Sequence, residues 1–198
     1  MKFILIQLIT LVVVSSTLCA QTTKGSLSFG GGLSYRSHKL NTNEASKDHE
    51  FQLAPQAGYF IVDNLEIGIQ LILSVGETGL IAEPTKTSSL SIGPYARYFK
   101  FTSNDRFAFT AKAGFSIGSG KFNPSSGNDV KTGTIGFYLS PGFTYFLTDK
   151  WGLDFQLQGI IFNSYDDNKD VDNDNYSYFT FGVNSFNPSL GFRYYISK

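Results

Sequence analysis

Five charged residues fall where a period-two pattern places them on the small, polar face of β-strands: Glu66, Arg97, Lys112, Asp154 and Arg193. Acids and bases enclosed in one narrow interior are expected to pair, because an unpaired buried charge is costly. Glu66 and Asp154 open their strands, whereas Arg97 and Arg193 lie late in theirs, so these four should meet at one end. The set predicts a salt-bridged plug, which we favour, or a gated path for ions.

An acidic segment at 166–175 is the second candidate site. Asp170, Asp172 and Asp174 alternate as ligands do at the start of a calcium-binding loop. The match ends there, because the sixth position is Asn175 instead of glycine and the twelfth is Phe181 instead of glutamate. We expect a solvated surface loop, with a loosely held divalent cation as the alternative. We expect no cofactor and no other metal site.

Catalytic residues are scarce. The chain has one cysteine, Cys19, and two histidines, His38 and His49, which nearly excludes a zinc site, a disulfide scaffold and a cysteine nucleophile. Ser37 adjoins His38, but neighbours on a strand point to opposite faces. The sequence therefore predicts no enzyme, with a lipid-A-modifying enzyme as a minor alternative.

Composition narrows the class further. The 198 residues carry 16 basic and 16 acidic side chains, and no basic run suits nucleic-acid phosphates. Charged residues make up 16%, below the roughly 25% of soluble domains, and aromatic residues also make up 16%. We expect one domain that binds no nucleic acid.

The first twenty residues are typical of a secretory signal peptide. Lys2 precedes an apolar run from Phe3 to Val14, and small residues lead to Ala20. We expect a signal peptide at 1–20, cleavage after Ala20 and a mature domain at 21–198. A lipoprotein signal that uses Cys19 is the alternative, but Leu18 is larger than the residue usual before such a cysteine.

Alternation of apolar with small polar residues dominates the rest of the chain, which predicts β-strands. The eighth segment changes parity, and a bulge near Asn184–Ser185 would reconcile its two parts. The expected strands cover 26–36, 51–61, 65–74, 90–98, 107–117, 134–145, 151–161 and 179–196.

The connections between these strands alternate in length. Short ones at 62–64, 100–106 and 148–150 alternate with long polar ones at 37–50, 76–87, 119–131 and 163–176. Short turns at one end and long loops at the other are typical of a transmembrane barrel. A weak repeat accompanies them: an aromatic residue follows four positions after each of Pro55, Pro94, Pro141 and Pro188.

The polar face consists of glycine, serine, threonine and glutamine, which suit a narrow interior better than a water-facing surface. The apolar face is too aromatic for a soluble protein, although a soluble lipocalin-like barrel is the alternative. Aromatic residues near the short turns predict an interfacial girdle. Its expected members are Tyr59, Tyr98, Phe99, Phe107, Tyr145, Trp151, Phe192 and Tyr194.

Several segments resemble the small outer-membrane β-barrel family of Gram-negative bacteria, particularly the Bacteroidetes-type "porin family" proteins. They are Ala20-Gln21 and residues 53–60, 64–68, 93–99 and 190–195. The resemblance covers the mature chain and implies a fold and a membrane, without an activity. Residues and resemblance together predict an all-β, eight-stranded, antiparallel up-and-down transmembrane barrel with a side-chain-filled lumen.

The expected role is structural or one of surface interaction, without turnover, through long loops outside the cell. A narrow passive channel for ions or very small solutes is the second hypothesis. The expected partners are outer-membrane lipid and lipopolysaccharide, together with an extracellular protein reached through the loops, and the expected state is a monomer. Fold alone supplies no function.

Overall fold

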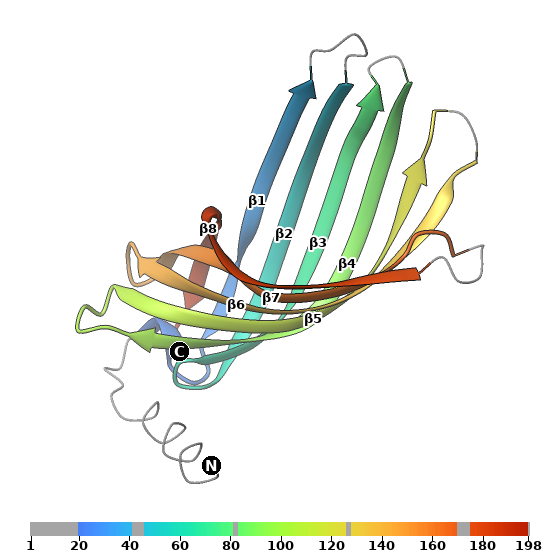
Figure 1. Ribbon diagram of the computed structural model, residues 1–198. Coiled ribbons are helices and arrows are strands. Elements are labelled where there is room, and N and C mark those ends of the chain that lie inside the picture. The colour runs from blue at the N-terminus through green and yellow to red at the C-terminus, as the bar shows by residue number, and fades with distance from the viewer. Residues whose placement is uncertain (1–19, 41–45, 81–82, 126–127, 170–174, 198) are drawn as a thin grey trace.

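A computed structural model describes residues 20–40, 46–80, 83–125, 128–169 and 175–197, which form a short 3-10 helix, η1, and eight strands (Figure 1). No helix among these residues is long and apolar enough to cross a membrane. The elements are η1 (Ala20–Thr22), β1 (Leu27–Leu40), β2 (Ser46–Val62), β3 (Leu65–Leu80), β4 (Glu83–Phe101), β5 (Phe107–Asn123), β6 (Val130–Phe146), β7 (Trp151–Asp166) and β8 (Asn175–Ile196).

The eight strands form one closed barrel in which each strand pairs with its neighbours in the chain and β8 pairs with β1. Every pairing is antiparallel. The predicted fold class is confirmed. Residues 1–19, which hold most of the expected signal peptide, lie outside the described residues.

Alternation determines which side chains face outward. Leu33, Ile69, Phe109 and Phe192 are each more than half exposed, whereas Phe60 and Phe99 at the opposite parity have no exposed surface. The outward apolar side chains continue around all eight strands. This apolar belt has the composition of a surface that faces lipid.

The expected long loops are mostly strand, which corrects the prediction. β1 continues to Leu40 and β2 begins at Ser46, while β3 and β4 are separated only by residues 81–82. The sequence predicted loops in these polar stretches because both of their faces are polar and no alternation is visible. Beyond the apolar belt both faces of a hairpin can meet water, so the alternation is lost while the backbone ladder continues.

Three of the repeated prolines interrupt the ladders between strands. Pro55, Pro94 and Pro141 each pair with the preceding strand, opposite Gly31, Ile69 and Ala111. None of the three appears in the ladder to the following strand. Proline cannot donate a ladder hydrogen bond, and these prolines therefore mark places of locally broken pairing.

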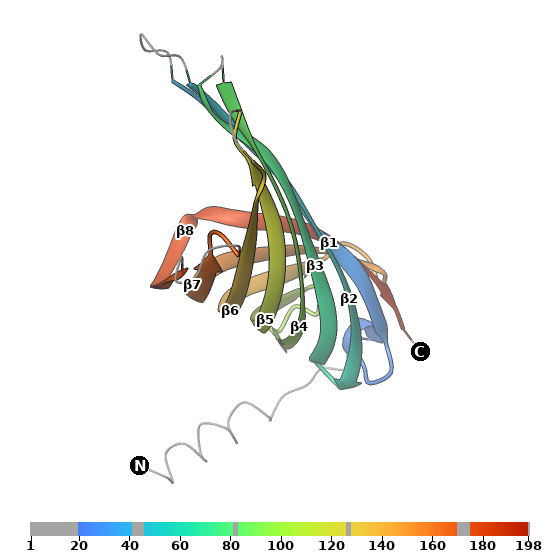
Figure 2. The same ribbon diagram turned by 90° about the vertical axis from the view of Figure 1, so that its right-hand side faces the viewer.

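The pairing that closes the barrel is the shortest. β1 and β8 pair only from Leu27↔Ile196 to Gly32↔Gly191, whereas β3 and β4 pair from Leu65↔Tyr98 to Leu80↔Glu83. From that short seam β1 and β8 diverge, as both views show (Figures 1 and 2). The seam lies near the end that carries the short connections 63–64, 102–106 and 147–150, which we call the short-turn end.

An irregularity in β8 accompanies this divergence. Gln156 pairs with Ser189 and Gln158 pairs with Asn184, so that a step from 156 to 158 on β7 spans 184 to 189 on β8. The bulge expected near Asn184–Ser185 is confirmed, and it is larger than a single inserted residue.

Candidate functional site

Four of the predicted charged residues meet inside the short-turn end, where they form a buried network. Asp154 Oδ2 accepts hydrogen bonds from Arg97 Nη1 at 2.6 Å and Arg193 Nε at 2.8 Å. Glu66 Oε1 accepts one from Arg193 Nη1 at 2.9 Å, and Glu66 Oε2 lies 3.8 Å from Arg97 Nε. Each acid therefore contacts both bases, and none of the four is more than 7% exposed.

Neutral side chains from further strands complete the network. Glu66 Oε1 accepts from Ser28 Oγ at 2.5 Å and from Tyr95 Oη at 2.6 Å. Asp154 Oδ1 accepts from Thr144 Oγ1 at 2.6 Å. Gln56 Oε1 accepts from Nη2 of both arginines, at 3.0 Å from Arg97 and 2.7 Å from Arg193. Such hydrogen bonds compensate the loss of water that burial imposes on charged groups.

Lys112 lies beside this network and takes no part in its ion pairs. Its ammonium donates to Gln70 Oε1 and lies 4.4 Å from the ring centre of Tyr95 and 5.5 Å from that of Tyr138. No ion pair among the described residues includes Lys112, although it is only 1% exposed. The buried set thus holds three bases and two acids.

A glycine makes room for the network. A Cβ atom on Gly58 would overlap the carboxylate of Glu66. Gly58 pairs with Gly68 across the β2–β3 ladder. A Cβ atom on Gly68 would overlap the ring of Tyr95. The inward glycines of these strands therefore leave the space that the larger side chains fill.

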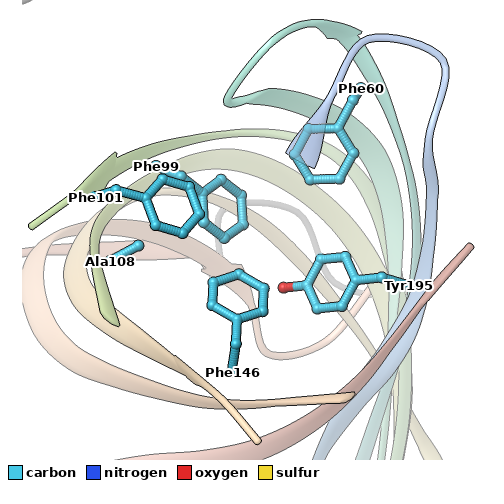
Figure 3. Close-up of a cluster of buried hydrophobic side chains, with 6 residues drawn as sticks. All are labelled: Phe60, Phe99, Phe101, Ala108, Phe146 and Tyr195. Carbon is cyan, nitrogen blue, oxygen red and sulfur yellow. The ribbon is translucent and has the colours of Figure 1, made fainter. Parts of the chain in front are cut away.

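An aromatic layer lies next to the charges, and the sequence did not predict it. Side chains from four strands turn toward one another there (Figure 3). Ring centres lie 5.6 Å apart for Phe60 and Phe99, 5.2 Å for Phe146 and Tyr195, and 5.5 Å for Phe101 and Phe146. The assignment of Phe99 to the outer girdle is wrong, because its side chain is buried inside the barrel.

The segment that precedes β1 covers the same end. Thr22 Oγ1 donates to Asn64 Oδ1 at 2.6 Å, and the Asn64 amide donates to the Thr22 carbonyl at 2.8 Å. Gln21 Nε2 reaches Asp149 Oδ1 at 3.4 Å. Charged layer, aromatic layer and N-terminal segment therefore succeed one another at the short-turn end.

The other predicted sites are not brought into a comparable arrangement. Asp170, Asp172 and Asp174 lie outside the described residues, and no group of three or more His, Cys, Asp and Glu residues in the described part could hold a metal ion. Register places Ser37 opposite His49 and His49 opposite Glu77. His49 Nε2 lies 3.5 Å from Glu77 Oε2, while its buried Nδ1 has no hydrogen-bond partner.

Comparison with known proteins identifies the family. A family model described as "Outer membrane protein beta-barrel domain" matches residues 9–185. The chain belongs to this family. Family membership indicates that the protein lies in the outer membrane, which agrees with its apolar belt. No curated protein matches the chain.

The chain is also similar to several solved structures at low sequence identity. The N-terminal barrel domain of Pseudomonas aeruginosa OprF is 15% identical, with 87% of this chain and 98% of that chain covered and a TM-score of 0.44. Neisserial surface protein A is 18% identical, with coverage of 85% and 94% and a TM-score of 0.44. Ail, the attachment invasion locus protein of Yersinia pestis, is 13% identical, with coverage of 88% and 100% and a TM-score of 0.44.

Proposed function

We propose that this protein is a non-catalytic outer-membrane barrel that is closed to solutes and acts through its surface. The observation that carries the proposal is the double filling of the short-turn end. The Glu66–Arg97–Asp154–Arg193 network occupies one level, and the aromatic layer around Phe146 occupies the next. Side chains fill narrow eight-stranded barrels in this way.

The hairpins supply the surface. β1 and β2 remain paired from Arg36↔Glu50 to Leu40↔Ser46, and β3 and β4 remain paired to Leu80↔Glu83, beyond the apolar belt. Following the usual orientation of such barrels, short turns face the periplasm and these hairpins face outward. We propose that a monomer contacts lipid and lipopolysaccharide along its belt and an extracellular protein through the hairpins.

Conductance in planar bilayers tests whether the filled end closes the barrel. One variant removes a charge pair together, Arg97→Ala with Asp154→Ala, so that net charge is kept. A second removes two inward rings, Phe99→Ala with Phe146→Ala, and a third combines all four changes. The matched control removes the adjacent outward rings, Tyr98→Ala with Tyr145→Ala.

We expect no stepwise conductance from the wild type or the control and clear steps from the fourfold variant, because both layers must be lost to open a path. Each variant is first shown to be folded by the change of its gel mobility on boiling. Steps in the wild type as large as those of the fourfold variant would favour the narrow channel. If the fourfold variant is folded and still shows no stepwise conductance, the plug is not what closes the barrel.

An enzyme is the remaining alternative, and the row of Ser37, His49 and Glu77 is the arrangement nearest to it. A general base must lie within hydrogen-bond reach of the group that it activates. His49 Nδ1 has no hydrogen-bond partner and the Glu77 contact is 3.5 Å long. We therefore propose no reaction for this row.

A further inference from the structure

The short β1–β8 seam opens a passage between the lumen and the outer face of the barrel. β1 and β8 are not paired beyond Gly32↔Gly191. A cavity of about 460 Å³ begins there. It is lined by Leu33, Tyr35 and Leu190, which point outward, and also by the inward arginines of the charged network. A cavity lined from both faces of a sheet must pass through the sheet.

The outer mouth of this cavity lies in the apolar belt. Leu33 is 62% and Tyr35 is 64% exposed, in line with the outward Leu53 and Phe51 that pair with them on β2. Unpaired strand edges do not persist against hydrocarbon unless they line a polar cavity or are covered. The mouth therefore faces lipid, and an apolar group is needed to cover its unpaired strand edges.

The inner end of the cavity is rich in hydrogen-bond donors. Gln156, one of its lining residues, has a buried Nε2 atom without a hydrogen-bond partner. Nη2 of Arg97 and Nη2 of Arg193, which both donate to Gln56 Oε1, lie at the same end. A ligand at this end therefore meets the unpartnered amide of Gln156 and two guanidinium groups.

The charged side chains also favour an anionic ligand. The charged side chains that line the cavity are two bases, Arg97 and Arg193, and one acid, Asp154. An enclosed excess of positive charge favours a monoanion. The volume of the cavity falls within the range of roughly 300–1,000 Å³ that small-molecule sites have.

We propose that the cavity binds a single-chain amphiphile with an anionic headgroup, a long-chain carboxylate, which enters from the bilayer through the β1–β8 seam. Its carboxylate accepts from Gln156 and the two arginines, and its chain leaves between Leu33 and Leu190. Because the site lies beside the plug and not across it, binding requires no open channel.

Equilibrium binding of radiolabelled oleate tests the site, with the folded full chain in phosphatidylcholine nanodiscs and empty nanodiscs as the blank. We expect saturable binding of one oleate per barrel that neither inorganic phosphate nor oleyl alcohol displaces. Displacement by phosphate would instead assign the site to free anions from water. Displacement by oleyl alcohol would mean that the carboxylate is not recognised, and uptake without saturation would leave only partition into lipid.

A reversible crosslink tests the route. Extending the seam register places Ser34 opposite Ser189, so Ser34→Cys with Ser189→Cys can close the mouth. The matched control, Ser74→Cys with Ser89→Cys, joins residues that are already paired at the same level of β3 and β4. We expect oxidation to weaken oleate binding about tenfold or more in the test pair only, and reduction to restore it.

The variant Gln156→Leu tests the inner end of the cavity. It also tests the proposed site if the disulfide between Ser34→Cys and Ser189→Cys does not form. We expect about tenfold weaker oleate binding with unchanged mobility on unboiled gels. Unchanged affinity in both the oxidised test pair and Gln156→Leu would overturn the proposal. Oleate binding is measured without any measurement of conductance. A failure of this proposal can therefore be told apart from a failure of the proposed plug.

Discussion

Adjacent aromatic residues at the ends of four strands divide between two environments. In Tyr59-Phe60, Tyr98-Phe99, Tyr145-Phe146 and Tyr194-Tyr195 the second ring is buried, at 1% exposure or less. The first ring is exposed or half-buried on the outer face. Successive residues of a strand must point to opposite faces. Each pair therefore supplies one ring to the girdle and one to the aromatic layer, and such pairs are the sequence signal that would have revealed that layer.

Glu66 is one of the two acids on which the charged network depends, because each of them contacts both arginines. Removing it by Glu66→Ala leaves the lumen with three bases and one acid. We expect the free energy of unfolding to fall by about 3–5 kcal/mol, the usual cost of breaking a buried ion pair.

Urea titration, with the folded fraction read on unboiled gels, measures this loss. Glu77→Ala is the control, because the ion pairs of Glu77 with His49 and Lys86 are half-buried or exposed, and we expect it to cost less than about 1 kcal/mol. Equal losses for the two variants would mean that the buried network does not stabilise the barrel.

At the scale of elements, the hairpins beyond the belt are held by local polar contacts as well as by their ladders. Asp48 Oδ1 on β2 accepts from Thr78 Oγ1 at 2.6 Å and from the Gly79 amide at 3.2 Å. The hydrogen bond from Thr78, with help from the Gly79 amide, holds the pKa of Asp48 below its ordinary value of 3.8. Gly79 adopts φ of 108°, a conformation that suits glycine.

This contact should make the pairing between β2 and β3 at the outer end of the barrel sensitive to acid. A lowered pKa means that the contact stabilises the fold above the ordinary pKa of Asp48 and is lost as pH falls through the lowered value. We expect the protection factor of the Gly79 amide against hydrogen exchange to fall between about pH 5 and about pH 2. In Asp48→Asn, which accepts the same bonds without titrating, protection should not change with pH, and a parallel fall there would exclude the carboxylate as the cause.

At the scale of the whole molecule, six residue pairs between β1 and β8 convert a curved sheet into a barrel. Gly30 lies within this seam, where a Cβ atom would overlap the backbone of Phe192 and come 2.8 Å from the Cα atom of Arg193. Gly32 lies at the end of the seam, and the nearest atom to a Cβ there is the Leu190 carbonyl oxygen at 3.4 Å. Closure therefore depends on a few close backbone approaches.

Two glycine variants measure that dependence. We expect wild-type protein to fractionate with the outer membrane and to change its gel mobility on boiling, as closed barrels do. Gly30→Ala should lower the free energy of unfolding by about 1–3 kcal/mol, the cost of overpacking, and lose the compact band at a lower temperature. Gly32→Ala should behave as wild type. Equal behaviour of the two variants would mean that the seam is not the point of closure.

The sequence by itself determined the strands, their number and the face that meets lipid. These properties are local: alternation can be read along one strand, as in Leu65–Leu73, and the small polar residues of the other face show which side is enclosed. The same alternation placed Glu66, Arg97, Asp154 and Arg193 inside, because parity alone decides on which face a side chain lies.

Tertiary structure decided which inward side chains meet and where the barrel stays open. Arg193 contacts Ser28, Gln56 and Glu66 across sequence separations of up to 165 residues, and such partners follow from strand stagger rather than from any one strand. The hairpin extensions depend on pairing between strands after alternation has ceased. The short seam between β1 and β8 and the irregularity of β8 against β7 are both matters of register between strands, which is a property of the closed sheet and not of any one strand.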